Sequence, residues 1–123
     1  MDVLWDIIMA LSEFEIKKCE KIVREYIEKH RPPAYLRNEV DLSFRIKEQS
    51  VEIFEIRAMW NDPTEKIEEF VAKATYVKSR NIWKIFWKRA DLKWHSYQPV
   101  PEVKTLEEFL DVIEEDAYSC FFG

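Results

Sequence analysis

The spacing of apolar residues changes along the chain and predicts helix, sheet and helix, in that order. Between Ser12 and His30, apolar positions recur every three or four residues, which is typical of one face of an α-helix. Ser12 and Glu15 have the spacing of a capping box, which marks a helix start. Pro32 and Pro33 cannot continue the helix. We therefore expect a long helix that ends near His30.

Beyond the prolines, apolar and polar residues alternate with a period of two, which predicts strands. The expected strands are residues 41–46, 51–60, 70–77, 82–88 and 90–97, with residues 61–69 as a loop. In the first hairpin we expect Lys47 to lie opposite Val51. This register puts Asp41 across from Arg57 and places both of them, with Glu55, on the same face of the sheet.

The predicted fold class is α+β, with a long N-terminal helix, a five-stranded antiparallel meander and a short C-terminal helix. Thr105 and Glu108 have capping-box spacing and mark the start of the last helix. Both helices are expected to cover one sheet face and to leave the other exposed. The tryptophans at positions 60, 83, 87 and 94 are expected to pack in the core. Residues 9–123 are expected to form a single domain, with residues 1–8 as an apolar N-terminal appendage.

Composition restricts the classes of function. Hydrophobic residues make up 47% of the 123 residues and charged residues 35%, which is typical of a soluble globular domain. The one glycine is the last residue, so glycine-rich phosphate-binding loops are excluded. Cys19 is expected in the core and Cys120 in a packed tail, and their spacing fits no zinc motif. This cysteine usage fits a reducing cytoplasm, and the short acidic N-terminal stretch predicts no signal peptide or membrane span.

The uncovered sheet face is the expected functional surface. Between residues 70 and 100, basic residues far outnumber the single acid, Asp91, whereas acids dominate after Pro101. Lysines can hold phosphates, and exposed rings, expected here at Phe86 and Tyr97, can stack on bases. This pattern favours a non-enzymatic module, without a cofactor, that binds nucleic acid or another anionic ligand. The expected contact residues are Arg45, Arg57, Lys73, Lys84, Lys88, Lys93, His95 and Tyr97.

A metal-dependent phosphodiesterase is the first alternative. An acid on one strand and an acid followed by a base on the next is an arrangement in which carboxylates hold a divalent metal and a lysine activates water. Asp41 and Glu55 supply the carboxylates, but the base after Glu55 is Arg57, which cannot accept a proton. Lys73 on the neighbouring strand could take its place.

Two further possibilities concern His95 and the N-terminal appendage. His95 could act as a general base, oriented by a carboxylate. Asp91 lies four residues away, roughly 13 Å along a strand, so the carboxylate would have to come from another strand, as Glu55 could. Alternatively, the domain could serve protein interaction or homo-oligomerisation, with residues 1–8 in the interface.

Several stretches together resemble one known family. They are HRPP (30–33), VEIFEIRAMW (51–60), VAKATYV (71–77), WKIFWKRADLKWHSYQP (83–99), TLEEFL (105–110) and the terminal CFFG (120–123). In these stretches the chain is similar to the small bacterial family carried as domain of unknown function 3024, over residues 9–123. The chain departs from the family where VAKAT follows Phe70 instead of a proline. The resemblance implies a stand-alone bacterial domain and assigns no activity, cofactor or site residue.

Overall fold

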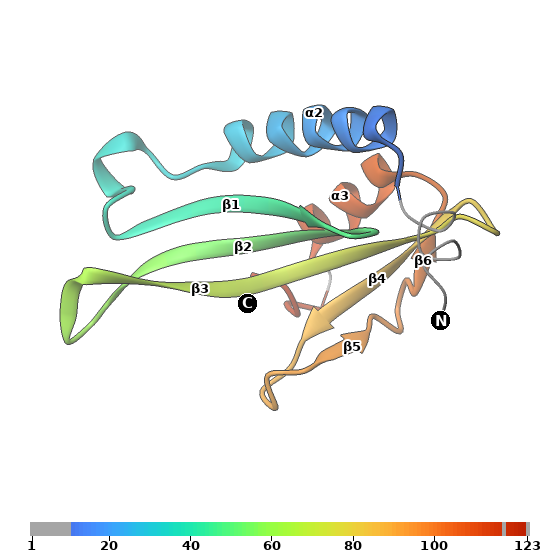
Figure 1. Ribbon diagram of the computed structural model, residues 1–123. Coiled ribbons are helices and arrows are strands. Elements are labelled where there is room, and N and C mark those ends of the chain that lie inside the picture. The colour runs from blue at the N-terminus through green and yellow to red at the C-terminus, as the bar shows by residue number, and fades with distance from the viewer. Residues whose placement is uncertain (1–10, 117, 123) are drawn as a thin grey trace.

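The computed structural model describes residues 11–116 and 118–122 and confirms the α+β fold class (Figure 1). Its elements are α2 (Glu13–His30), the 3-10 helix η1 (Ala34–Leu36), β1 (Val40–Lys47), β2 (Ser50–Met59), β3 (Asp62–Val77), β4 (Ile82–Lys88), β5 (Trp94–Ser96), β6 (Glu102–Val103) and α3 (Leu106–Glu115). The strands form one antiparallel sheet in the order β1-β2-β3-β4-β5, and the short β6 pairs with β4. The expected appendage, residues 1–8, lies outside the described residues.

Both helices begin where their capping signals predict. At α2, the Ser12 hydroxyl accepts a hydrogen bond from Glu15 N (3.1 Å), and the Glu15 carboxylate accepts one from Ser12 N (2.9 Å). At α3, the Thr105 hydroxyl accepts from Glu108 N at 3.1 Å. Neither described α-helix is long and apolar enough to cross a membrane.

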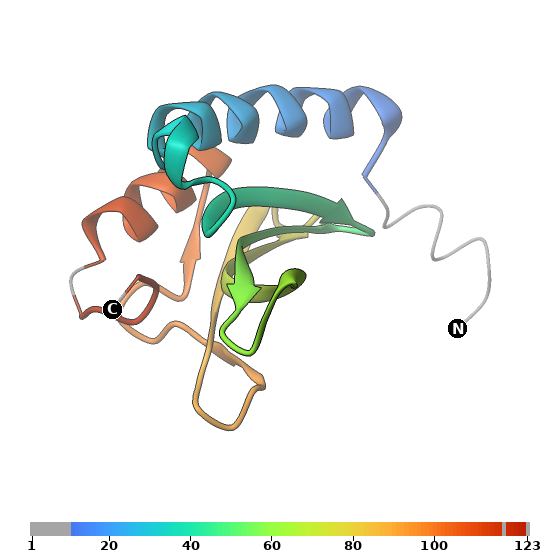
Figure 2. The same cartoon turned by 90° about the vertical axis from the view of Figure 1, so that its left-hand side faces the viewer.

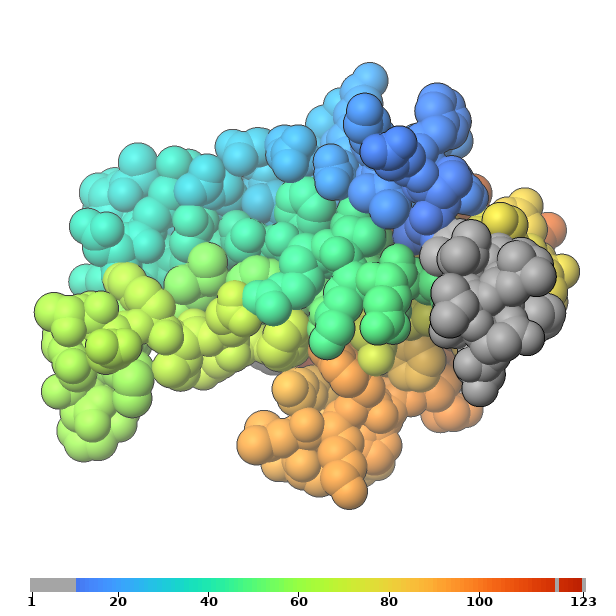
Figure 3. Space-filling model, in the orientation of Figure 1, coloured from blue at the N-terminus to red at the C-terminus, as the bar shows by residue number. Residues whose placement is uncertain are grey.

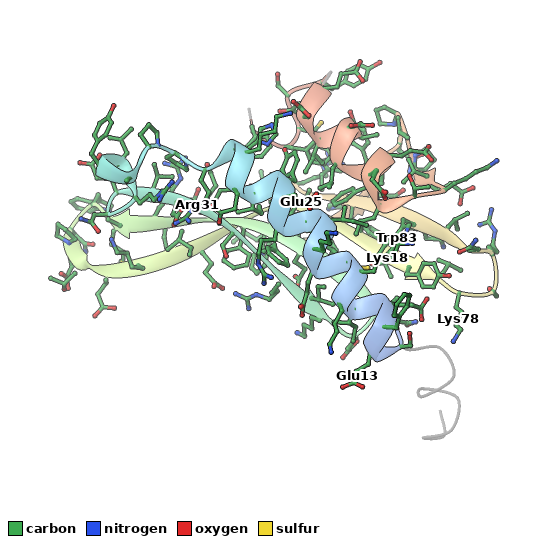
Figure 4. All side chains as sticks on the ribbon, turned by 90° about the horizontal axis from the view of Figure 1, so that it is seen from above. Glu13, Lys18, Glu25, Arg31, Lys78 and Trp83 are labelled. Carbon is green, nitrogen blue, oxygen red and sulfur yellow. The ribbon has the colours of Figure 1, made fainter. Side chains whose placement is uncertain are left out.

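The two α-helices lie on the same side of the sheet (Figure 2). Seen from above, α2 crosses the strands, from Glu13 at its start to Arg31 just after its end (Figure 4). The buried face of α2 includes Val23 and Ile27, and that of α3 includes Phe109 and Ile113. Below the helices, fully buried strand residues such as Ile53 and Ile85 complete the core, and Cys19 is buried as expected.

The first hairpin differs from the expected register by one residue. Lys47 pairs with Ser50, so Asp41 lies opposite Ile56 and not Arg57. The cause is a two-residue loop whose first residue, Glu48, has φ = 56°, in the left-handed region that such turns usually reach with glycine. Because side chains alternate along a strand, the shift exchanges the two faces of β2. Glu55 and Arg57 therefore lie on the helix-covered side, with Val51 and Ile53, and their expected placement on the open side is wrong.

The segment expected to be a loop, residues 61–69, belongs mostly to the long strand β3. Its pairing with the end of β2 extends the hairpin beyond the body of the sheet as an arm (Figure 1). Trp60 lies at the tip of this arm and is 93% exposed, so its expected place in the core is wrong. A ribbon that is exposed on both faces needs no alternation of apolar and polar residues, and therefore its sequence resembles that of a loop.

A bulge in β3 and the late start of β5 place two more aromatic side chains, Phe70 and Trp94, on the open face, whereas both were expected on the helix-covered face. Opposite the bulge, Ile53 pairs with Ala72 and the next residue, Phe54, pairs with Phe70, so that Val71 has no partner in β2. Phe70 thereby turns to the open side instead of the core. The last long strand was expected to start at residue 90, but β5 starts at Trp94, which pairs with Lys88 and also faces the open side.

Candidate binding face of the sheet

The sheet face turned away from α2 and α3 carries aromatic rings and cations side by side, and we call these residues the ring–cation cluster. The rings belong to Phe54 of β2, Phe70 of β3, Phe86 of β4 and Trp94 of β5, and the cations to Arg45 of β1, Lys73 of β3 and Lys88 of β4. The strand registers place all of these side chains on the open face. The cluster therefore extends over five neighbouring strands.

Phe70 is the centre of the aromatic part of the cluster. Its ring centroid lies 5.7 Å from that of Phe54 and 5.8 Å from that of Trp94. The ring planes of Phe70 and Trp94 meet at 72°, an edge-to-face arrangement that aromatic pairs favour. The contacts through Phe70 thus connect β2 with β5 across the open face.

Each cation of the cluster lies over two rings. The Arg45 guanidinium is 4.6 Å from the centroid of Phe54 and 5.7 Å from that of Phe70. Lys73 Nζ is 5.0 Å from the centroid of Phe86 and 4.9 Å from that of Trp94. Lys88 Nζ is 4.7 Å from Phe70 and 5.7 Å from Trp94. These distances suit cation–π attraction, which strengthens as water is excluded.

The charges around the cluster are only partly balanced. Glu52 of β2, buried to 9% exposure, pairs in register with Arg45 on one side and Lys73 on the other. Arg45 also forms an ion pair with Glu68. Burial lowers the pKa of Lys73; the charge of Glu52 opposes this shift, and the nearby Lys88 adds to it. Lys73 is therefore a partly dehydrated cation, a state in which an incoming anion is attracted more strongly than at a fully hydrated surface.

The structure brings together only some of the expected contact residues. Arg45, Lys73 and Lys88 belong to the cluster, and Lys84 lies beside it, opposite Thr75. The expected placement of the other four on the open face is wrong. Arg57 lies on the helix-covered side, Lys93 lies in the turn before β5, His95 pairs with Trp87 of the helix-covered side, and Tyr97 is 2% exposed within the core.

The two acids of the alternative metal site lie on opposite faces. The Asp41 carboxylate accepts hydrogen bonds from Arg31 Nε (3.0 Å) and Nη2 (2.8 Å), which hold its pKa below the usual value. Glu55 is bound by Arg57, with Nη2 and Oε1 3.1 Å apart. Among residues 11–116 and 118–122, no three His, Cys, Asp or Glu side chains are grouped so that they could hold a metal ion.

His95 has the carboxylate partner that strand geometry was expected to forbid. Its Nε2 lies 2.8 Å from Asp91 Oδ2. The expected separation of the two residues is wrong because Asp91 lies in a turn, where the chain folds back, and not in the strand. Hydrogen bonds from Lys93 N and from His95 lower the pKa of Asp91. Because His95 shares a face with Trp87, this pair lies away from the ring–cation cluster.

Phe86 lies on the open face as the sequence predicts, but three aromatic members of the cluster were missed in the sequence, Phe54, Phe70 and Trp94, together with Glu52. The stretch VEIFEI, residues 51–56, is apolar at both parities, with Val51 and Ile53 in one set and Phe54 and Ile56 in the other. Such a pattern is typical of a strand that is covered on both faces. It indicates that apolar groups also occupy the open side, but it does not say which set lies there.

Comparison with known proteins gives a family and no further relatives. A protein-family model described as a domain of unknown function, DUF3024, matches residues 11–123 and confirms the resemblance noted in the sequence. No curated protein and no solved structure matches the chain.

Proposed function

The chain belongs to the DUF3024 family, whose description states no activity, and from the geometry of the open face we propose that it binds single-stranded nucleic acid there. The ring–cation cluster carries this proposal. Unpaired bases stack on aromatic side chains, and neighbouring cations neutralise the phosphates. Rings and cations alternate across the whole face at contact distance, so both parts of a nucleotide would find their partners within one patch.

A single strand suits the cluster better than a duplex. Phe54 is buried at 4% exposure, and the rings of Phe70, Phe86 and Trp94 are half-buried in the sheet face. The half-buried rings can reach a base only if that base is unstacked. In single strands the bases are free to turn toward such rings. Stacking does not depend on base identity, and therefore we expect weak sequence preference.

The acidic residues are distributed so that they leave the cluster accessible. The exposed acids of α3 lie on the far side of the sheet from the cluster (Figure 2). On the arm, the negative charge of Glu69 is paired with Arg57 (3.2 Å). Glu68 is paired with Arg45 of the cluster itself. The net charge of −5 thus does not describe the open face, and the acids elsewhere would confine a polyanion to that face.

The surface view shows where such a strand would have space. In Figure 3 the β2–β3 arm and the β4–β5 hairpin project from the body of the molecule, with a recess between them. Cluster residues lie on the strands that lead into both projections. Phe54 and Phe70 lie on β2 and β3 at the base of the arm, and Lys88 and Trp94 lie on β4 and β5. A short run of nucleotides placed across the sheet would contact both.

A binding assay with matched variants tests the proposal. We expect labelled oligothymidylate of about ten nucleotides to bind at low ionic strength, with log Kd rising linearly with log salt. Lys88→Met should weaken binding and reduce that salt slope by about one, since one phosphate contact is lost. Lys78→Met, a like substitution in the turn between β3 and β4, is the control and should change neither.

The contribution of aromatic stacking to oligonucleotide binding needs a separate variant. Trp94→Ala should weaken binding by roughly tenfold, the scale of one lost stacking contact. Absence of binding at low salt would reject the proposal, as would equal losses for Lys88→Met and Lys78→Met.

A further inference from the structure

A pocket lies at the edge of the sheet, where β5 meets the C-terminal segment 118–122. Its volume is about 400 Å³, and the residues important here are Arg89, His95, Gln98, Tyr118 and Cys120. No member of the ring–cation cluster lines it. A volume of this size suits a small ligand.

The C-terminal wall of the pocket is held in place by the fold. The Asp116 carboxylate accepts hydrogen bonds from Phe121 N (3.0 Å) and Phe122 N (2.8 Å). The buried Phe121 ring packs against Tyr97, with centroids 4.8 Å apart. Tyr118 and Cys120 are therefore presented to the pocket by a segment that is anchored on both sides of Cys120.

The pocket contains a cation without a matching anion. Arg89 lies over the Trp87 ring at 5.6 Å, and it makes no ion pair with any residue that the structure describes. Two nearby carboxylates, those of Asp91 and Asp116, already have partners. Asp91 binds His95 and Lys93 N (2.9 Å), and Asp116 binds the backbone amides of the C-terminal segment. The planar guanidinium favours an oxyanion, either a carboxylate or a phosphate, which it can bind through two hydrogen bonds.

The remaining lining groups can donate hydrogen bonds to such an anion. Ser96 and Tyr118 contribute hydroxyl groups and Gln98 an amide. The His95 ring is held by Asp91 at 2.8 Å, which fixes its orientation at the rim. We propose that this pocket binds the carboxylate or phosphate group of a small molecule, with Arg89 as its charge partner.

Cys120 gives this proposal a direct readout. It lines the pocket, whereas Cys19 is buried in the core and serves as an internal control for unfolding. Alkylation of Cys120 by iodoacetamide would be followed by mass spectrometry in sodium phosphate, in sodium acetate and in sodium chloride of matched ionic strength. Burial raises the pKa of the Cys120 thiol, so a fixed alkaline pH keeps the reaction measurable.

We expect phosphate, acetate or both to slow the alkylation of Cys120, by about fivefold when the free anion is at four times its Kd. Comparison of the two anions shows whether the pocket takes a phosphate or a carboxylate. Arg89→Met should abolish this protection. Arg80→Met should preserve it, because Arg80 is paired with Glu102 (3.0 Å) and does not line the pocket.

Equal rates in all three salts would overturn the proposal, and so would protection that persists in Arg89→Met. Titration of the unmodified protein with phosphate and with acetate, followed by the NMR signals of the His95 ring, supplies a measurement that needs no variant. Those signals should shift with the same Kd as the protection. The result does not depend on nucleic-acid binding, since the two sites share no residue.

Discussion

The two faces of the sheet both carry large apolar side chains, but these are covered in different ways. On one face, Ile53 and Ile85 are fully buried beneath α2 and α3. On the other, half-buried rings such as Phe70 are covered only by neighbouring rings and by the side chains of single lysines and arginines. A helix cannot leave its sheet without unfolding the domain, whereas a lysine side chain changes rotamer within nanoseconds. The first face is therefore a core, and the second is a surface whose cover a ligand can replace.

Matched phenylalanine truncations should separate the two faces most strongly. Phe109→Ala removes a fully buried ring of α3 from the core and should lower the free energy of unfolding by about 3–5 kcal/mol. Phe70→Ala removes a half-buried ring from the open face and should cost about 1–2 kcal/mol, because less apolar area is lost. Urea denaturation of both variants checks this. Equal losses would mean that the open face is as much a core as the other.

The ion pair between Arg31, just after α2, and Asp41 of β1 should make the stability of the fold sensitive to acid. Hydrogen bonds from Arg31 hold the pKa of Asp41 below its usual value, so this carboxylate stabilises the fold fully above the pKa it has in the unfolded chain. That contribution is lost as the pH falls through the lower pKa of the folded state. Between about pH 5 and pH 3 the wild type should therefore lose more stability than Asp41→Asn. Thermal melts across this range measure the difference, and parallel curves for the two proteins would contradict the pair's role.

A charge removed from the open face should affect binding much more than stability. Lys73→Met keeps most of the chain length that covers Phe86 and Trp94 and removes only the charge. We expect the free energy of unfolding to change by about 1 kcal/mol or less, the scale of one cation–π contact. Binding of the oligonucleotide should weaken severalfold in the same variant. A large loss of stability would show that Lys73, placed opposite Glu52, serves to stabilise the fold.

How much of the difference between the two faces can be predicted from the sequence depends on how local the sequence signals are. The helix starts were predicted because Ser12 with Glu15, and Thr105 with Glu108, act within one turn. The faces of β4 were predicted because Trp83 and Ile85 alternate clearly with Lys84. These signals need no knowledge of the rest of the fold.

The ring–cation cluster depends on three features that are not local. The turn at Glu48 sets the parity of β2 without a glycine to reveal it. The bulge beside Val71 turns Phe70 to the open side. The late start of β5 at Trp94 reverses the parity expected for residues 90–97. Each feature is selected by how strands fit together in the whole sheet. Cations such as Lys73 were therefore found, whereas the rings of Phe54, Phe70 and Trp94 were not.

The smallest effect is expected at the tip of the arm. Trp60 is the most exposed of the large hydrophobic side chains that the structure describes, and truncation there removes almost no buried area. Trp60→Ser should therefore change the free energy of unfolding by no more than about 0.5 kcal/mol. It should also leave oligonucleotide binding unchanged, because the turn between β2 and β3 that holds Trp60 lies far from β5, the strand that carries Trp94 of the cluster (Figure 1). A clear loss of binding in this variant would extend the binding surface along the arm, whereas a clear loss of stability would mean that Trp60 is buried in solution.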